Sequence, residues 1–217
     1  MKRSLDSRVD YSLLLPVFFL LVIGVVAIYI AVSHDYPNNI LPILGQQVAW
    51  IALGLMIGFV VMLFNTEFLW KVTPFLYILG LGLMVLPIVF YNPSLVASTG
   101  AKNWVSVNGV TLFQPSEFMK ISYILMLARV IVQFTKKHKE WRRTIPLDFL
   151  LIFWMILFTI PVLVLLALQS DLGTALVFVA IFSGIVLLSG VSWKIIIPVF
   201  VTAVTGIAGF LAIFISK

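Results

Sequence analysis

Two short polar segments interrupt an otherwise apolar sequence, and they contain the side chains best suited to chemistry. Residues 113–120 read FQPSEFMK and supply Glu117 and Lys120, and residues 169–174 read QSDLGT and supply Asp171. Two carboxylates and an ammonium group can together bind a divalent cation, orient a hydroxyl group or hold a pyrophosphate. The spacing does not choose among these roles. Because an ionisable group in a membrane segment is costly, its first interpretation is functional.

The same residues also have a structural interpretation. Pro115 suits the first turn of a helix, and Glu117 then lies where the helix dipole favours a carboxylate. Glu117 and Lys120 are three residues apart, so they share a helix face and can form an ion pair. For residues 113–120, the sequence favours a well-capped helix start and a functional site equally. Asp171 is either the N-cap of the next helix or a carboxylate that faces the same cavity as Glu117 and Lys120.

The composition places these segments in a membrane protein. The chain has 217 residues, of which 62% are hydrophobic and 10% charged, and its mean hydropathy is +1.17. Soluble domains contain about 25% charged residues. Cysteine is absent, and the two histidines, His34 and His138, lie far apart in sequence. This argues against disulfides, thiolate chemistry, a histidine metal site and a Ser-His-Asp triad. Membrane orientation explains most of the net charge of +6, and no nucleic-acid partner is expected.

The hydropathy pattern predicts an all-α polytopic membrane protein, with residues 1–217 as a single membrane domain. A transmembrane helix needs about 20 apolar residues, and seven segments qualify: 12–32, 45–64, 71–90, 115–135, 148–168, 174–190 and 195–215. Basic residues favour the cytoplasmic side. A cytoplasmic N-terminus leaves only Lys102 and Lys217 outside, and the last helix then ends outside. The basic residues placed inside are Lys2, Arg3, Arg8, Lys71, Lys136, Lys137, Lys139, Arg142, Arg143 and Lys194.

This orientation makes residues 91–114 an extracytoplasmic loop and residues 136–147 a basic cytoplasmic loop. In the outer loop, Asn108-Gly109 stands between Val-Ser-Val and Val-Thr-Leu, which predicts a tight hairpin in a small folded lid at the membrane surface. Trp104 in this loop is either an interfacial anchor or a substrate contact. The inner loop is either a topology anchor attracted to anionic lipids or a patch that binds a partner.

Three motifs in chain order carry a family resemblance. Residues 100–104 (GAKNW), 113–120 and 169–174 resemble the GAxRW, QPSExxK and QPDLGT patterns of the SEDS family (RodA, FtsW, SpoVE). The resemblance covers the whole chain, and the sequence looks most like the RodA branch, which serves cell elongation. Two positions depart from the pattern. Asn103 replaces arginine, so the resemblance supports a phosphate contact at this position only if Lys102 substitutes for it, and Ser170 replaces proline.

The resemblance implies a peptidoglycan glycosyltransferase of the bacterial cell membrane that polymerises a lipid-linked disaccharide precursor and works with a class B penicillin-binding protein. Membrane lipid is a further partner. The resemblance implies no definite cofactor, although a divalent cation remains an option. It also implies no metal site built from protein ligands alone. The residues that we expect to bind substrate are Lys120, Glu117, Asp171, Gln114, Lys102, Trp104 and Gln169.

The family has ten spans, and its proposed catalytic aspartate lies in a large outer loop after the seventh. The resemblance therefore implies that this chain is an N-terminal part of the family length, that its catalytic residue lies beyond Lys217, and that it is inactive alone. Two other functions stay open: a transporter of the lipid-linked precursor, with Lys120, Glu117 and Asp171 as a polar pathway, and a noncatalytic scaffold for wall synthesis. The clustering of polar groups at the outer face favours the enzyme.

Overall fold

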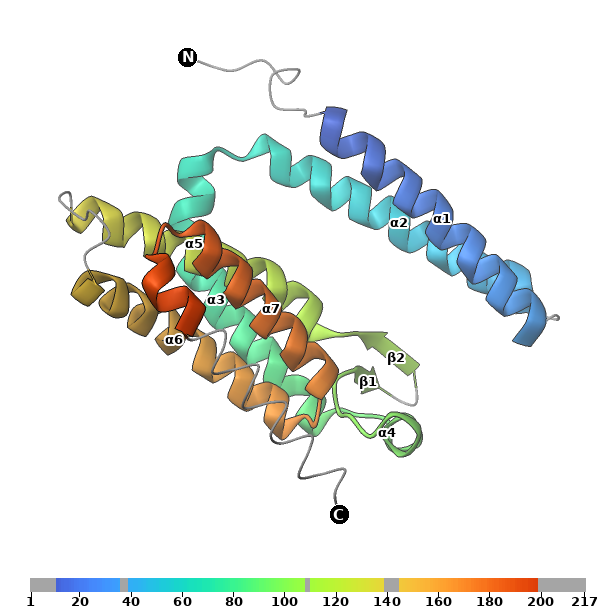
Figure 1. The fold of residues 1–217 in the computed structure, drawn as a ribbon. Helices are drawn as coiled ribbons and strands as arrows, with labels where there is room; N and C mark the ends of the chain where they lie inside the picture. The colour runs from blue at the N-terminus through green and yellow to red at the C-terminus, as the bar shows by residue number, and fades with distance from the viewer. Residues whose placement is uncertain (1–10, 36–38, 108–109, 139–144, 199–217) are drawn as a thin grey trace. The chain divides into compact units, whose positions relative to one another are not determined.

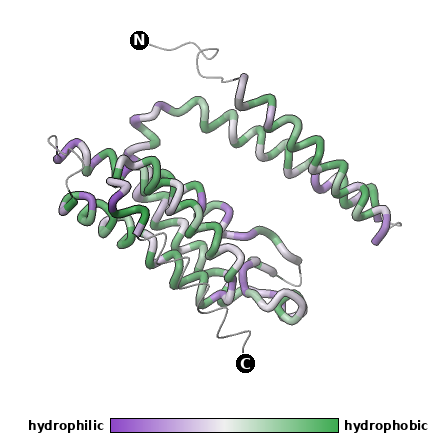
Figure 2. The backbone as a smooth tube through the Cα atoms, viewed as in Figure 1, coloured by the Kyte–Doolittle hydropathy of each residue, from purple (hydrophilic) through white to green (hydrophobic). Residues whose placement is uncertain are grey.

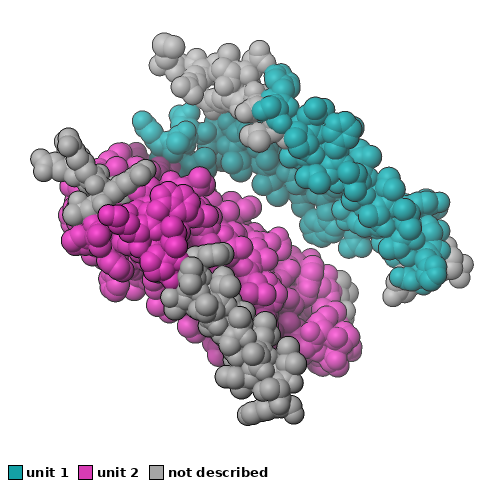
Figure 3. Space-filling model, viewed as in Figure 1, with its two compact units in different colours: residues 1–69 teal, residues 70–217 magenta. Residues whose placement is uncertain are grey.

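The computed structural model describes residues 11–35, 39–107, 110–138 and 145–198. The chain divides into two compact units, residues 1–69 and residues 70–217 (Figure 3). Each unit is described by itself. The single membrane domain expected from the sequence stays a prediction.

The first unit contains a pair of helices that pack against each other, α1 (Tyr11–Asp35) and α2 (Ile40–Leu63). Both are apolar around most of their circumference, and no residue of α2 is buried by the protein. A helix that is hydrophobic on all sides is typical of a membrane span. The exposed side chains of these helices are therefore suited to contact with lipid.

The second unit is a helical bundle built from α3 (Thr66–Val89), α5 (Pro115–Lys137), α6 (Ile145–Leu168) and α7 (Leu172–Leu188) (Figure 1). Its core gathers buried side chains from all four helices, among them Met84, Tyr123, Leu151 and Phe178. Two buried tyrosines add hydrogen bonds between helices. The Tyr77 hydroxyl donates to the Phe158 carbonyl oxygen at 2.5 Å, and the Tyr123 hydroxyl lies 2.8 Å from the Thr159 hydroxyl. Such bonds contribute about 0.6 kcal/mol each in membrane bundles.

The prediction of a polytopic membrane protein is confirmed. Among the described residues, α1, α2, α3, α5 and α6 are long and apolar enough to cross a membrane, and α7 is apolar but shorter. Hydrophobic residues run along the helices, and hydrophilic ones gather towards their ends and connections (Figure 2). Six of the predicted spans coincide with these helices. The seventh, 195–215, lies mostly outside the described residues, of which 193–198 are helical.

The hairpin predicted in the outer loop is present. Strand β1 (Val105–Val107) pairs antiparallel with β2 (Val110–Phe113), and Asn108-Gly109 lies outside the described residues. The loop also contains a short helix that the sequence analysis missed, α4 (Pro93–Thr99). Its signals are local: the Asn92 side chain accepts from the Ser94 N–H at 3.0 Å, Pro93 starts the helix, and Gly100 ends it at φ 75°.

The end of α5 and the start of α6 lie at the opposite end of the bundle from α4 and the hairpin (Figure 1). Near that end, the buried Asp148 carboxylate accepts from the Ser192 N–H at 3.0 Å. Arg129 also points towards that end of α5, where its guanidinium donates to the Trp70 carbonyl oxygen and lies 5.3 Å from the Trp70 ring centre. The segment 136–147 was predicted as a basic loop, but both of its ends are helical. Helix α5 continues to Lys137, and α6 begins at Ile145.

Candidate functional site

Asp171 lies at the turn between α6 and α7, where it caps the first turn of α7. Its Oδ1 accepts from the Thr174 backbone N–H at 3.0 Å, and its Oδ2 accepts from the Thr174 hydroxyl at 2.7 Å. A side-chain oxygen that accepts from a free N–H of the first turn defines an N-cap. The predicted capping role of Asp171 is therefore confirmed, and it does not exclude a functional one.

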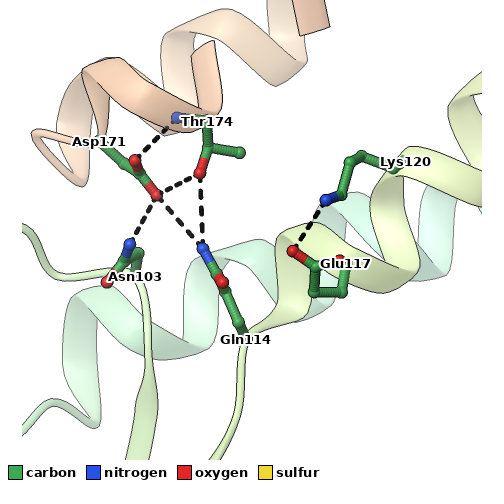
Figure 4. Close-up of polar contacts among 6 residues, drawn as sticks. All are labelled: Asn103, Gln114, Glu117, Lys120, Asp171 and Thr174. Carbon is green, nitrogen blue, oxygen red and sulfur yellow. Dashed lines mark hydrogen bonds and ion pairs between the residues drawn. The ribbon is translucent and has the colours of Figure 1, made fainter. Parts of the chain in front are cut away.

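The same carboxylate also binds side chains from two other segments (Figure 4). The Asn103 amide donates to Asp171 Oδ2 at 2.7 Å, and the Gln114 amide approaches the same oxygen at 3.4 Å. Asn103 precedes β1, and Gln114 is the N-cap residue of α5. Asp171 thus joins the loop of residues 91–114, the start of α5 and the start of α7. Asn103 occupies the place where the family pattern has arginine, so a neutral amide here meets the carboxylate.

The environment of Asp171 favours its ionised form. Burial, which leaves the residue 7% exposed, would by itself raise its pKa. The hydrogen bonds from the Thr174 N–H and hydroxyl, from Asn103 and from Gln114 outweigh that effect and hold the pKa of Asp171 below its usual value. A carboxylate that accepts four hydrogen bonds and has a low pKa is a poor proton acceptor at neutral pH. Its chemistry suits the positioning of three segments better than general-base catalysis.

Glu117 and Lys120 form the predicted ion pair on the first turns of α5. The Lys120 Nζ lies 2.8 Å from Glu117 Oε1, and the Glu117 side chain is 62% exposed while that of Lys120 is 26% exposed. An exposed pair contributes about 0–1 kcal/mol to stability. The pair follows Gln114 along the same helix, but the hydrogen bonds of Asp171 go to other residues (Figure 4). The charged pair and the Asp171 cluster are therefore neighbouring, separate features.

The other predicted substrate residues occupy different surroundings. Gln169 is 1% exposed, and its amide donates to the Met84 carbonyl oxygen of α3. Its backbone carbonyl accepts from the Lys102 N–H at 2.8 Å, so Gln169 connects the bundle to the loop of residues 91–114. The Lys102 ammonium lies 4.6 Å from the centre of the Tyr91 ring. Trp104 is 37% exposed. Substrate contact stays a prediction for all three residues.

Two buried polar atoms in this region have no partner among the described residues. They are Asn103 Oδ1 and Ser116 Oγ, and Ser116 itself is 2% exposed. Buried polar atoms are almost always paired with protein, water or ligand. No group of three or more His, Cys, Asp or Glu suited to a metal occurs in the described part of the chain. The participation of a divalent cation stays a prediction.

An apolar groove of about 450 Å³ begins at Asp171. It is lined by residues of α6 and α7, including Leu163, Ala167, Leu172 and Leu176, with Ser170 and Asp171 at its polar end. Ser170 has φ 58°, and its N–H donates to the Ala167 carbonyl oxygen at 3.0 Å. This arrangement ends α6 sharply and brings the backbone to Asp171. An apolar groove with a polar end suits a ligand that has both a hydrocarbon chain and a polar group.

The fold and this polar cluster define a multi-pass membrane protein with an ordered polar site where the loop of residues 91–114 meets the bundle. A family model described as "Cell cycle protein", covering FtsW, RodA and SpoVE, matches residues 11–217. The chain therefore belongs to the FtsW/RodA/SpoVE family.

Two relatives show how the chain compares with longer proteins. It is 28% identical over 198 residues to the probable peptidoglycan glycosyltransferase FtsW of Nitrosomonas europaea, which covers 88% of this chain and 48% of that protein. It is 30% identical over 189 residues to the peptidoglycan glycosyltransferase MrdB of Escherichia coli, which covers 87% of this chain and 46% of that protein. The chain spans about half the length of these relatives.

Solved structures agree with the family assignment. The crystal structure of the rod shape determining protein RodA of Thermus thermophilus matches with a TM-score of 0.62 and 26% identity, covering 90% of this chain and 59% of that one. A chain from a study of polymerization and crosslinking by a peptidoglycan synthase complex matches with a TM-score of 0.59 and 26% identity, covering 85% of this chain and 52% of that one.

Proposed function

We propose that this chain provides the substrate-positioning half of a peptidoglycan glycosyltransferase that polymerises a lipid-linked disaccharide precursor. The proposal is supported by family membership and by relatives named as peptidoglycan glycosyltransferases. We assign it to cell elongation, with a class B penicillin-binding protein as partner. The likeness to RodA and to a peptidoglycan synthase complex supports these two points.

The observation that carries the proposal is the arrangement of chemical groups around Asp171. A carboxylate held by four hydrogen bonds fixes the outer loop against the starts of α5 and α7. An apolar groove leads away from it, and an accessible ion pair, Glu117–Lys120, lies on the adjacent turn of α5. A lipid-linked sugar needs these three elements: a path for its hydrocarbon chain, a cation for its pyrophosphate, and rigid polar walls.

In this function each group has a separate task. Lys120 exchanges Glu117 for the pyrophosphate of the donor, which stabilises the negative charge that develops on the leaving group. Glu117, released from the ion pair, accepts hydrogen bonds from sugar hydroxyls. Asp171 is a positioning residue, because it acts by holding Asn103, Gln114 and Thr174 in place. The glycosidic bond forms when the acceptor hydroxyl oxygen attacks C1 of the donor sugar, the bond from C1 to the pyrophosphate breaks, and the lipid pyrophosphate leaves. The hydroxyl proton passes to a base, and we assign that base to no residue described here.

Polymerisation by the purified full-length protein tests this assignment. With lipid-linked disaccharide as substrate, Lys120→Ala and Glu117→Ala should lower the rate of polymerisation about a hundredfold, the usual effect of losing a charge-stabilising group. Ser98→Ala, on the exposed face of α4, is the matched control and should leave the rate unchanged. A wild-type rate of polymerisation in both Lys120→Ala and Glu117→Ala would show that the ion pair has only a structural role. Transport of precursor across vesicles without polymer formation would support the transporter.

A further inference from the structure

A second groove lies at the opposite end of the bundle from the Asp171 cluster, between α5 and α6. Its volume is about 290 Å³. The floor is apolar and aromatic and includes Met126, Val130, Leu150, Trp154 and Phe158, and the mouth is polar, with Gln133, Lys137 and His138. We propose that this groove binds one anionic glycerophospholipid from the adjacent leaflet, with its phosphate at Lys137 and an acyl chain against Trp154 and Phe158.

The dimensions of the groove fit one leaflet. Between Met126 and Lys137, α5 rises about 16 Å at 1.5 Å per residue. Half of the hydrocarbon core of a bilayer measures about 15 Å. A lipid whose phosphate lies at Lys137 therefore places its acyl chain along the whole apolar floor. A soluble phosphate bound at Lys137 would not cover the apolar floor. The floor and its half-exposed Trp154 would then remain open to lipid tails.

The mouth of the groove has a charge that suits an anionic headgroup. Lys137 and Lys136 form the basic last turn of α5, and Lys137 lines the groove while Lys136 does not. The His138 ring is held in place beside them, because it packs on Phe134 with ring centres 4.3 Å apart and its Nδ1 lies 3.1 Å from the Phe134 carbonyl oxygen. Basic pockets between transmembrane helices bind anionic headgroups in this way.

Native mass spectrometry of the purified full-length protein tests the proposal, with phosphatidylglycerol as the probe and phosphatidylcholine as its zwitterionic comparison. The wild-type protein should retain one phosphatidylglycerol more tightly than phosphatidylcholine. Lys137→Gln should weaken that binding about fivefold, as expected for one basic residue near a membrane surface. Lys136→Gln, on the same turn but outside the groove, should change it far less. Soluble glycerol phosphate should not compete, because it lacks the acyl chain.

The apolar floor is tested separately by filling it. Leu150→Trp adds bulk to the groove and should abolish retention of the lipid, whereas Ile156→Trp, on an exposed face of the same helix that does not line the groove, should leave it intact. Val130→Trp tests the same volume from α5 if the Leu150 variant does not fold. Equal losses in Lys137→Gln and Lys136→Gln, or full retention with a filled groove, would overturn the proposal.

Discussion

At the residue scale, Asp171 concentrates more interactions than any single side chain of the predicted site. Its two oxygens accept from Asn103, Gln114 and Thr174, which belong to three different segments. A carboxylate can accept from all these donors at once, whereas a carboxamide has one acceptor oxygen and a donor group. Replacing one carboxylate oxygen of Asp171 by an amide nitrogen should therefore disturb the hydrogen bonds of the whole Asp171 cluster.

We expect Asp171→Asn to lower the stability of the protein by about 2 kcal/mol at neutral pH, the scale of lost hydrogen bonds to a charged group. The N–H group of the introduced amide would face the N–H groups of the Asn103 and Gln114 side chains, so that two donors meet without an acceptor. Thermal unfolding in detergent measures the loss. The double variant Asp171→Asn with Asn103→Asp restores a donor–acceptor pair and should recover part of the stability. Failure of that rescue would show that the Asn103 contact contributes little.

The same residue predicts a pH dependence with a definite sign. Because the pKa of Asp171 is lower in the folded protein, its stabilising contribution is present above the unfolded value of about 3.9 and is lost as pH falls through the folded value. The difference in melting temperature between wild type and Asp171→Asn should therefore be constant near neutrality and shrink below about pH 4. A difference that stays constant down to pH 3 would contradict this assignment of the charge.

Ser170 yields a third prediction at this scale. Its φ of 58° lies in the left-handed region, and its N–H donates to Ala167. Proline permits neither feature, since its ring holds φ near −65° and it has no N–H. Ser170→Gly should raise stability by about 1 kcal/mol, and Ser170→Pro, which restores the residue of the family pattern, should lower both stability and polymerisation. Equal stability of the two variants would show that the turn adapts.

At the scale of elements, Gly80 of α3 lies directly against Met119 and Ser122 of α5. A Cβ atom placed there would lie 2.6 Å from Met119 Sδ and 3.0 Å from Ser122 Oγ, whereas one at Gly82 would meet nothing within 4 Å. Small residues allow helices to pack closely in membranes. The α3–α5 contact therefore depends on the absence of a side chain at Gly80.

Gly80→Leu should destabilise the protein by about 1–3 kcal/mol, the usual cost of overpacking, and Gly82→Leu is its matched control. Thermal unfolding in detergent compares the two variants directly. Gln114 begins α5, so a displaced α5 should also lower polymerisation in the Gly80 variant. Equal stability of the two leucine variants would mean that α3 and α5 separate without cost.

At the scale of the whole molecule, the open question is orientation. The bundle has two distinct ends, one with α4 and the hairpin and one where α5 ends and α6 begins (Figure 1). The distribution of Lys and Arg predicts that the first end is extracytoplasmic. The chain has no native cysteine, so single introduced thiols can report on each end.

A cysteine at Ser98 in α4 should react with a membrane-impermeant thiol reagent in intact cells, and one at Lys136 should react only after the membrane is opened. Both positions are exposed, so reactivity depends on the side of the membrane. The reverse pattern would invert the topology and place the Asp171 cluster in the cytoplasm.

The sequence alone determined the helices, the hairpin and the family. These features follow from local chemistry: apolar runs of sufficient length, Asn-Gly between β-forming residues, and Pro115 at a helix start. The ion pair of Glu117 with Lys120 and the N-cap at Asp171 were also predictable, because their partners lie three residues away on the same helix. Helix α4 was overlooked although Asn92, Pro93 and Gly100 signal it.

Only the tertiary structure decided which of the polar residues contact each other. Asn103 and Asp171 are 68 residues apart, and no local rule predicts that such residues meet. The sequence analysis placed Glu117, Lys120 and Asp171 in one cavity because they lie at the same end of their helices. Their convergence on one substrate cavity stays a prediction. The fold joins Asp171 to Asn103, Gln114 and Thr174 and leaves the ion pair beside them. The reason is that helix rotation and close contacts, such as the one at Gly80, depend on packing between helices, which spacing along one helix does not determine.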